Sequence, residues 1–260
     1  MRRNKTVVFI GAGNVATHLS QAMKGVGFSV RQVFSRTADS AKALADILDC
    51  SYTTDIKMVL PDADIYVFSL KDDALPNIVA DMAINDGLWI HTAGSVHVDV
   101  FCGYAKRYGV LYPMQTLSKS RETDFSIVPL FVEGCTEDVE DDIFKIAGML
   151  SENIMSMGSD KRRYVHLAAV FACNFSNHMY SLAAKILDKE GIDSNILLPL
   201  IDETASKMHS MSPQEAQTGP AVRYDRNVID RHLSMLEEES MRRLYTMMSE
   251  SIHEEVKIKN

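Results

Sequence analysis

The sequence predicts an α/β domain, built on a mainly parallel and doubly wound sheet, followed by an all-α domain. Short apolar runs alternate with helical stretches over residues 6–150, which is typical of a parallel sheet covered by helices on both faces. After residues 153–158 the strand signal disappears, and apolar residues recur at three- and four-residue spacing. We therefore expect one domain over residues 1–153 and a helical domain over residues 154–260.

The strands of the first domain are expected where short apolar runs alternate with turns or helices. They fall at residues 6–10, 28–34, 64–70, 88–92, 110–112 and 129–132, with helices at residues 17–24 and 74–82. Ligands of such a sheet lie outside the carboxyl ends of its strands. This rule places Gly11, Ser35, residues 69–71 and residues 91–94 along one rim.

The second domain is expected to begin with a long helix over residues 160–190. The next helix is expected at residues 195–211, where Pro199 must lie in the first turn or kink the helix. A serine cap, a proline at the first helical position and Glu215 indicate a short helix from residue 212. Two further helices are expected, at residues 225–239 and 240–258.

Composition limits the classes of protein that fit. A chain of 260 residues with 46% hydrophobic content can build real cores. The net charge of −8 argues against a nucleic-acid partner or an anionic membrane surface, because both select basic faces. The chain has no apolar run of about 18 residues, and its leader at residues 1–5 meets a strand rather than a signal-peptide apolar region. We expect a cytoplasmic protein with no membrane partner.

The cysteines indicate neither a metal site nor a disulfide framework. Cys50, Cys102, Cys135 and Cys173 are widely scattered and form no C-x-x-C pair. We expect them to be reduced and mostly structural, and we expect no metal.

A glycine-rich turn is the most specific motif. The sequence Gly11-Ala12-Gly13-Asn14-Val15-Ala16 is a G-x-G-x-x-A turn between an expected strand and an expected helix. Its glycines let the backbone approach a pyrophosphate, and the helix start offers free N–H groups. The following strand completes a βαβ unit, which favours a dinucleotide site at Gly11, Gly13, Asn14 and Val15 over an ordinary strand-to-helix turn.

The second strand ends in Ser35-Arg36-Thr37, where an NAD enzyme usually carries an acid for the ribose 2′-OH. Arg36 can pair with a 2′-phosphate, and the two hydroxyls can donate to it, so NADP is favoured over NAD. The alternative is that Arg36 is an ordinary solvated charge and that Asp39 is the acid, out of register.

Other residues of the rim complete the expected site. Ser69, Leu70, Lys71, Ala93 and Gly94 are expected to contact the cofactor. Candidate hydrogen-bond or proton donors to a reacting group are His91, Ser95, His97, Gln115, Thr116, His166 and Asn174. Of these, Ser95, Gln115 and Thr116 are expected to contact the substrate. Arg223 could clamp a substrate carboxylate, or could pair with Asp225 and merely fix a loop.

The whole chain resembles a family of bacterial proteins that join an NADP-binding Rossmann domain to a helical domain and are labelled NADP oxidoreductases of the deazaflavin-dependent type. The segments that carry the resemblance are the glycine turn, His91-Thr92-Ala93-Gly94-Ser95, Leu111-Tyr112-Pro113-Met114-Gln115-Thr116, residues 166–174 and residues 216–221. More remotely, the layout is similar to pyrroline-5-carboxylate reductase and to the 6-phosphogluconate dehydrogenase-like group. This resemblance implies an active site in the interdomain cleft and a homodimer formed through the helical domain.

One departure from the wider group affects the chemistry. The β-hydroxyacid dehydrogenases of that group carry a lysine four residues before an asparagine on the first long helix of the second domain. Asn174 fits the asparagine, but Val170 stands where the lysine would be. His166, two helical turns before Asn174, could replace the lysine as the proton donor.

The function expected is that of an NADP-dependent oxidoreductase that transfers a hydride between NADP(H) and a small carbonyl or imine substrate, with His166 and Asn174 as catalytic residues. A different class stays open, a catalytically silent NADP-binding sensor or scaffold protein. A hydrolase that uses Ser95 fits less well, because Gly94-Ser95 lacks the surrounding G-x-S-x-G sequence.

Overall fold

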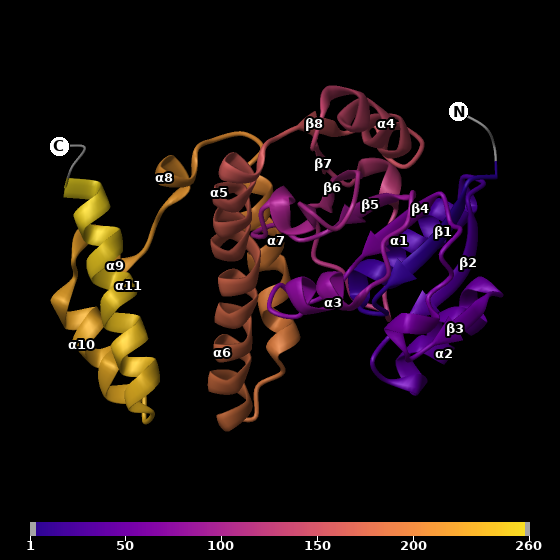
Figure 1. Cartoon of the computed structure of the whole chain (residues 1–260). Helices are drawn as coiled ribbons and strands as arrows, with labels where there is room; N and C mark the ends of the chain where they lie inside the picture. Colours follow the sequence, from indigo (N-terminus) through magenta and orange to yellow (C-terminus); the bar gives the residue numbers. More distant parts are fainter. Residues whose placement is uncertain (1–3, 258–260) are drawn as a thin grey trace. The chain divides into compact units, whose positions relative to one another are not determined.

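The structure, a computed structural model, describes residues 4–257 (Figure 1). It divides into two compact units, one that extends through His178 and one that begins at Met179. Residues 1–3 of the expected leader lie outside the described residues. Ile258, the expected end of the last helix, also lies outside them.

The first unit is built on an eight-stranded sheet with the strand order β3-β2-β1-β4-β5-β6-β7-β8. All neighbours pair in parallel except β6 and β7, which are antiparallel. This confirms the expected mainly parallel, doubly wound sheet. The strands are β1 Thr6–Ile10, β2 Ser29–Phe34, β3 Ser51–Thr53, β4 Ile65–Phe68, β5 Leu88–His91, β6 Arg107–Pro113, β7 Leu130–Gly134 and β8 Ile154–Ser156.

The strand order creates a switch point between β1 and β4. The chain runs outward from β1 through β2 to β3, and then returns to pair β4 on the other side of β1. In open α/β sheets ligands bind at such a point, outside the carboxyl ends of the strands. The glycine turn that follows β1 lies there.

Apolar residues on alternate positions of the strands form two cores. Val7 and Phe9 point into one core, which α1 and α4 cover, whereas Val8 and Ile10 join Trp89 in the other. The helices of this part are α1 Asn14–Gly25, α2 Ala38–Leu48, α3 Leu75–Asp81 and α4 Glu137–Gly148, with 3₁₀ turns η1 Ile56–Met58, η2 Val98–Phe101 and η3 Phe125–Ile127. The sequence did not predict strands β3 and β8. Each strand has only three residues, and none of these residues is buried.

The long helix expected at residues 160–190 is present, but a π-helical turn interrupts it. It consists of α5 Ser159–Ala169, the π turn η4 Val170–Phe175 and α6 Ser176–Lys189. Such turns contain an extra residue per turn, are found mostly as single turns inside α-helices and are frequent at functional sites.

The remaining helices belong to the second unit and follow their expected caps. Pro199 lies in the first turn of its helix, Ser212 and Glu215 form a capping box, and Asp225 caps the helix that follows it. The elements are η5 Ser194–Leu197, α7 Leu198–Lys207, α8 Pro213–Ala216, α9 Pro220–Arg223, α10 Arg226–Met235 and α11 Glu239–Lys257. The helix expected at residues 225–239 thus ends early, at Met235. Within residues 4–257, no helix has both the length and the hydropathy that a membrane span requires.

A buried arginine ties α5 to the sheet. The side chain of Arg162 is fully buried and forms an ion pair with Glu133 of β7. It also donates to the carbonyl oxygen of Val96 at 2.6 Å and to the hydroxyl of Ser159 at 3.0 Å. These contacts join α5 to the sheet, and both belong to the same compact unit. This unit extends beyond residue 153. The boundary expected between residues 153 and 154 stays a prediction.

We predict that Arg162→Ala lowers the free energy of unfolding by about 3 kcal/mol, because it leaves the Glu133 carboxylate without its partner. Urea unfolding followed by circular dichroism measures the change. The matched control is Arg163→Ala at the next position, whose ion pair with Asp160 is exposed; it should cost less than about 1 kcal/mol. Equal losses in the two variants would contradict the role given to Arg162.

Candidate active site

The first glycine of the turn is required by the close approach of two backbone segments. Gly11 has a φ of +121°, and a Cβ atom at this position would lie 2.1 Å from the carbonyl oxygen of Ser69. The N–H of Gly11 donates to Phe34 at the end of β2 at 2.8 Å. Only glycine fits both the conformation and the space. The turn is therefore fixed between the ends of β2 and β4.

The second glycine faces open space. Gly13 is the N-cap residue of α1, and a Cβ atom there would meet nothing within 4 Å. No side chain caps this helix start, and no acidic residue lies in its first turn. The free N–H groups and the positive end of the helix dipole thus suit an anionic group such as a pyrophosphate.

A cavity of about 1170 Å³ brings the predicted residues together. Its lining includes every residue predicted to contact the cofactor, both residues predicted to be catalytic, and two of those predicted to contact the substrate. These are Gly11, Gly13, Asn14, Val15, Ser35, Arg36, Thr37, Ser69, Leu70, Lys71, Ala93, Gly94, His166, Asn174, Gln115 and Thr116.

Two residues predicted to contact the substrate do not line this cavity. Ser95 instead donates a hydrogen bond to the Asp72 carboxylate. Arg223 ends the short helix α9 in the second unit, and Asp225 caps α10. Both assignments to the substrate stay predictions.

The lining of the cavity includes three basic side chains without a partner among the described residues. Arg36, Lys71 and Lys119 line it, and none of their side chains has a hydrogen bond or an ion pair within residues 4–257. Asp39, the alternative acid, is exposed in the first turn of α2 and is not part of the lining. An unpaired guanidinium at the end of β2 suits a phosphate better than a ribose hydroxyl.

The cavity also contains a pair of polar rings, His166, which the sequence predicted as a catalytic residue, and Tyr112, which it did not. The hydroxyl of Tyr112 lies 3.0 Å from Nδ1 of His166, and their ring centroids are 5.9 Å apart. Tyr112 is the sixth residue of β6, which is parallel to β5, so its side chain reaches the same rim of the sheet. The position of Tyr112 near the end of this strand could have placed it at the rim from the sequence. Only the folded structure shows that His166 lies next to its hydroxyl.

His166 and Asn174 lie on the helical wall of the cavity, His166 in α5 and Asn174 in the π turn η4. Between them the wall is formed mainly by small side chains, among them Ala168, Ala169 and Ala172.

Two of the other candidate donors have structural roles. His91 is fully buried, and its Nδ1 accepts a hydrogen bond from the N–H of Ala93 at 3.2 Å. Burial lowers the pKa of His91 to about 3, and the charge of Arg162 adds to the effect. His97 caps the turn η2, and its Nδ1 lies 3.3 Å from Oδ2 of Asp99. Neither histidine lines the cavity.

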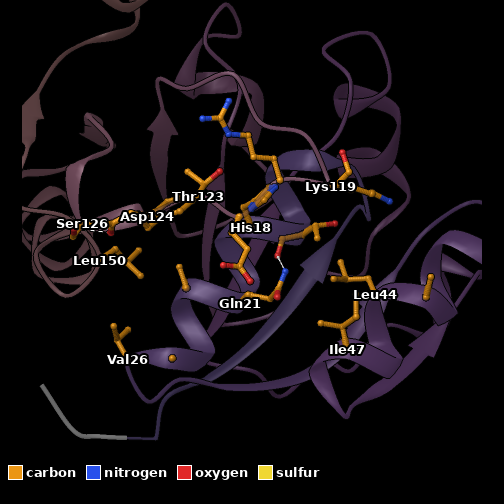
Figure 2. Close-up of a pocket in the computed structure, with 18 residues that line it drawn as sticks. His18, Gln21, Val26, Leu44, Ile47, Lys119, Thr123, Asp124, Ser126 and Leu150 are labelled. Atoms are coloured by element: carbon orange, nitrogen blue, oxygen red, sulfur yellow. Dashed lines mark hydrogen bonds between the residues drawn. The ribbon is translucent and has the colours of Figure 1, made fainter.

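A second cavity, of about 660 Å³, is lined by residues of α1, of α2 and of the loop that joins β6 to η3 (Figure 2). Figure 2 shows the apolar side chains Val26, Leu44 and Ile47 along one side of it and Lys119 and Thr123 along the other. The loop is held on α1 at two points. The amide of Asn14 donates to Leu117 at 2.7 Å, and Nε2 of His18 lies 2.9 Å from the carbonyl oxygen of Ser118.

A glycine turn at the switch point of a doubly wound sheet, followed by an uncapped helix start, defines the class of dinucleotide-binding α/β proteins. Residues 6–93 match the family described as NADP oxidoreductase coenzyme F420-dependent, and residues 128–252 match a domain of unknown function, DUF2520. Over 97% of its length the chain is 47% identical to a putative NADP oxidoreductase from Bacteroides fragilis, 99% of which is covered, with a TM-score of 0.92. The chain belongs to this family of NADP oxidoreductases.

More distant structures share the fold. An imine reductase from Myxococcus stipitatus, solved in complex with NADP⁺, is 18% identical, with a TM-score of 0.67 over 97% of this chain and 94% of that one. A 1-pyrroline-5-carboxylate reductase from Streptococcus pyogenes is 11% identical, with a TM-score of 0.62 over 97% and 100%. No curated protein sequence matches the chain.

We predict that His91 makes the protein less stable as the pH falls below 6.5. The folded state keeps His91 neutral down to a pKa of about 3, whereas the unfolded chain binds a proton near the ordinary value of 6.5. The contribution of His91 to the free energy of unfolding is therefore fully present above pH 6.5 and is lost as the pH falls toward 3. The free energy of unfolding falls by up to about 1.4 kcal/mol per pH unit in this range.

Urea unfolding at pH 7.0, 6.0 and 5.0 measures this slope. His91→Leu should be less stable at pH 7 but should lose less further stability on acidification than the wild-type protein. Parallel curves for the two proteins would contradict the assignment.

Proposed function

We propose that the protein transfers a hydride between NADP(H) and a small carbonyl or imine substrate. The observation that carries the proposal is that a single cavity contains the free helix start and Arg36 at one end and the Tyr112–His166 pair at the other. The first end suits a dinucleotide phosphate, and the second can donate a proton to a reacting group.

The residues of the first end fit NADP. The N–H groups after Gly13 would hold the pyrophosphate, since the open space at this glycine leaves room for it. Arg36 would pair with the 2′-phosphate, with Ser35 and Thr37 as hydroxyl donors. Ala93 and Gly94, which follow the end of β5, would border the nicotinamide.

NADPH supplies the hydride when it is bound, and the protein must supply a proton to the oxygen or nitrogen that gains charge. His166 is the proposed proton donor, and the amide of Asn174 would orient the same group. The small side chains between them leave room for a substrate. The imine reductase and a reductive aminase from Aspergillus terreus, solved with NADPH, lend support to an imine or carbonyl as the substrate.

The proposal includes a homodimer formed through the helical domain and a cytoplasmic location. Tyr164, Leu167, Phe171 and Phe175 recur at three- and four-residue spacing along α5 and η4 and are 65%, 53%, 63% and 50% exposed. Apolar side chains grouped in this way are typical of an interaction surface. Sedimentation equilibrium distinguishes one chain from two.

We predict that the wild-type protein binds NADPH more tightly than NADH, and that Arg36→Asp erases or reverses this preference. The substitution removes a charged hydrogen bond, at a cost of about 1.5–3 kcal/mol in NADPH affinity. Isothermal titration with each cofactor measures it. In the companion variant Gly13→Val the protein should stay folded yet bind neither cofactor, because the added side chain fills the space at the helix start. Equal titration curves for the two cofactors in the wild-type protein would refute the role of Arg36.

We predict that His166→Ala and Asn174→Ala each lower kcat, by about 100-fold for the proton donor, with NADPH affinity nearly unchanged. NADPH oxidation is followed with a panel of carbonyl and imine compounds and with coenzyme F420. The matched controls are Asn177→Ala and His178→Ala, the same residue types on exposed positions that do not line the cavity. Tight NADPH binding without turnover of any compound in the panel would favour the alternative of a silent NADP-binding sensor.

A further inference from the structure

The ring of His166 is held between two groups of the sheet domain. On one side lies the backbone of Gly94, where an added Cβ atom would be 2.7 Å from Cγ and Nδ1 of the histidine. On the other side lies the hydroxyl of Tyr112, 3.0 Å from Nδ1. The remaining ring nitrogen, Nε2, has no hydrogen-bond partner within residues 4–257.

Tyr112 is itself rigidly placed. It is 9% exposed, and its register partner on β7 is Phe131. The two rings stack with centroids 6.1 Å apart and an interplanar angle of 23°. A hydroxyl fixed in this way can set the orientation of the histidine ring that it contacts.

The hydroxyl of Tyr112 can donate this hydrogen bond when Nδ1 of a neutral His166 carries no proton. Burial raises the pKa of Tyr112 and Asp72 adds to the rise, against the opposing charge of Arg162, so the phenol stays protonated at neutral pH. A protonated phenol that donates to Nδ1 leaves the ring proton of the histidine on Nε2. The nitrogen that carries the proton is then the one without a protein partner.

We infer that Tyr112 is a positioning residue that acts through His166, holding Nδ1 as an acceptor so that Nε2–H is directed at the reacting group. The catalytic consequence rests on the proposed function, whereas the hydrogen bond itself does not. In the reductive direction the hydride that NADPH would supply adds to the substrate carbon while the Nε2 proton passes to its oxygen or nitrogen. The hydroxyl proton of Tyr112 moves to Nδ1, so that the histidine stays neutral, and the phenolate regains a proton from solvent.

The hydrogen bond is tested by ¹⁵N NMR of the full-length, histidine-labelled protein at a pH where His166 is neutral, without any substrate. The His166 signals are identified by their loss in His166→Gln. In Tyr112→Phe the Nδ1 resonance should move downfield, as an acceptor nitrogen does when its donor is removed. Tyr108→Phe is the control, because this tyrosine lies on the same strand but does not line the cavity. An unchanged Nδ1 resonance in Tyr112→Phe would overturn the inference.

The catalytic consequence is tested by a double-mutant cycle on kcat with a substrate from the panel. Tyr112→Phe should lower kcat about tenfold, the effect of one hydrogen bond, and should leave NADPH affinity unchanged. In the His166→Gln background the same substitution should have no further effect, because its partner is already gone. A further loss in that background would show that Tyr112 acts on the substrate directly. If no substrate turns over, the proposed function fails while the NMR result still decides the hydrogen bond.

Discussion

The buried ion pair between Arg162 and Glu133 places the helical wall of the cavity. Arg162 is one helical turn before His166, so both side chains leave α5 on the same face, toward the sheet. The arginine fixes the helix to β7 and to the segment after β5, and the histidine then meets Tyr112 at the end of β6. A buried charge pair is costly to form, but once formed it permits few alternative positions for the helix.

The sequence predicted those parts of the structure that depend on local patterns. Short continuous apolar runs such as Val7 to Ile10 predicted the parallel strands, and capping residues such as Ser212 and Asp225 indicated helix starts. The same patterns did not indicate β3, whose residues are all at least partly exposed. The π turn was also missed, since the spacing of apolar residues is too coarse to detect one extra residue in a long helix.

In the candidate site, too, the sequence predicted the residues of a local motif but not those that depend on a long-range contact. Gly11, Gly13 and Arg36 could be identified because a strand, a turn and a helix in order form a recognisable motif. Tyr112 could not, because its significance comes from a contact with His166 that is distant in sequence. His91, by contrast, was a candidate donor in the sequence but does not line the cavity. Its position at the end of β5 suggested the rim, but the side chain turns into the core beside Phe101.

The attachment of the loop after β6 limits how the loop can move. A loop that acts as a gate swings about its two ends, whereas this one is also held in the middle, by Asn14 at Leu117 and by His18 at Ser118. Both anchors belong to α1, so the loop can move only by breaking both hydrogen bonds or by carrying the helix with it. Because α1 begins at the glycine turn, a movement that carries the helix would also displace this turn. The middle of the loop therefore forms a wall of the cavity that is attached to α1, rather than a segment held only at its ends.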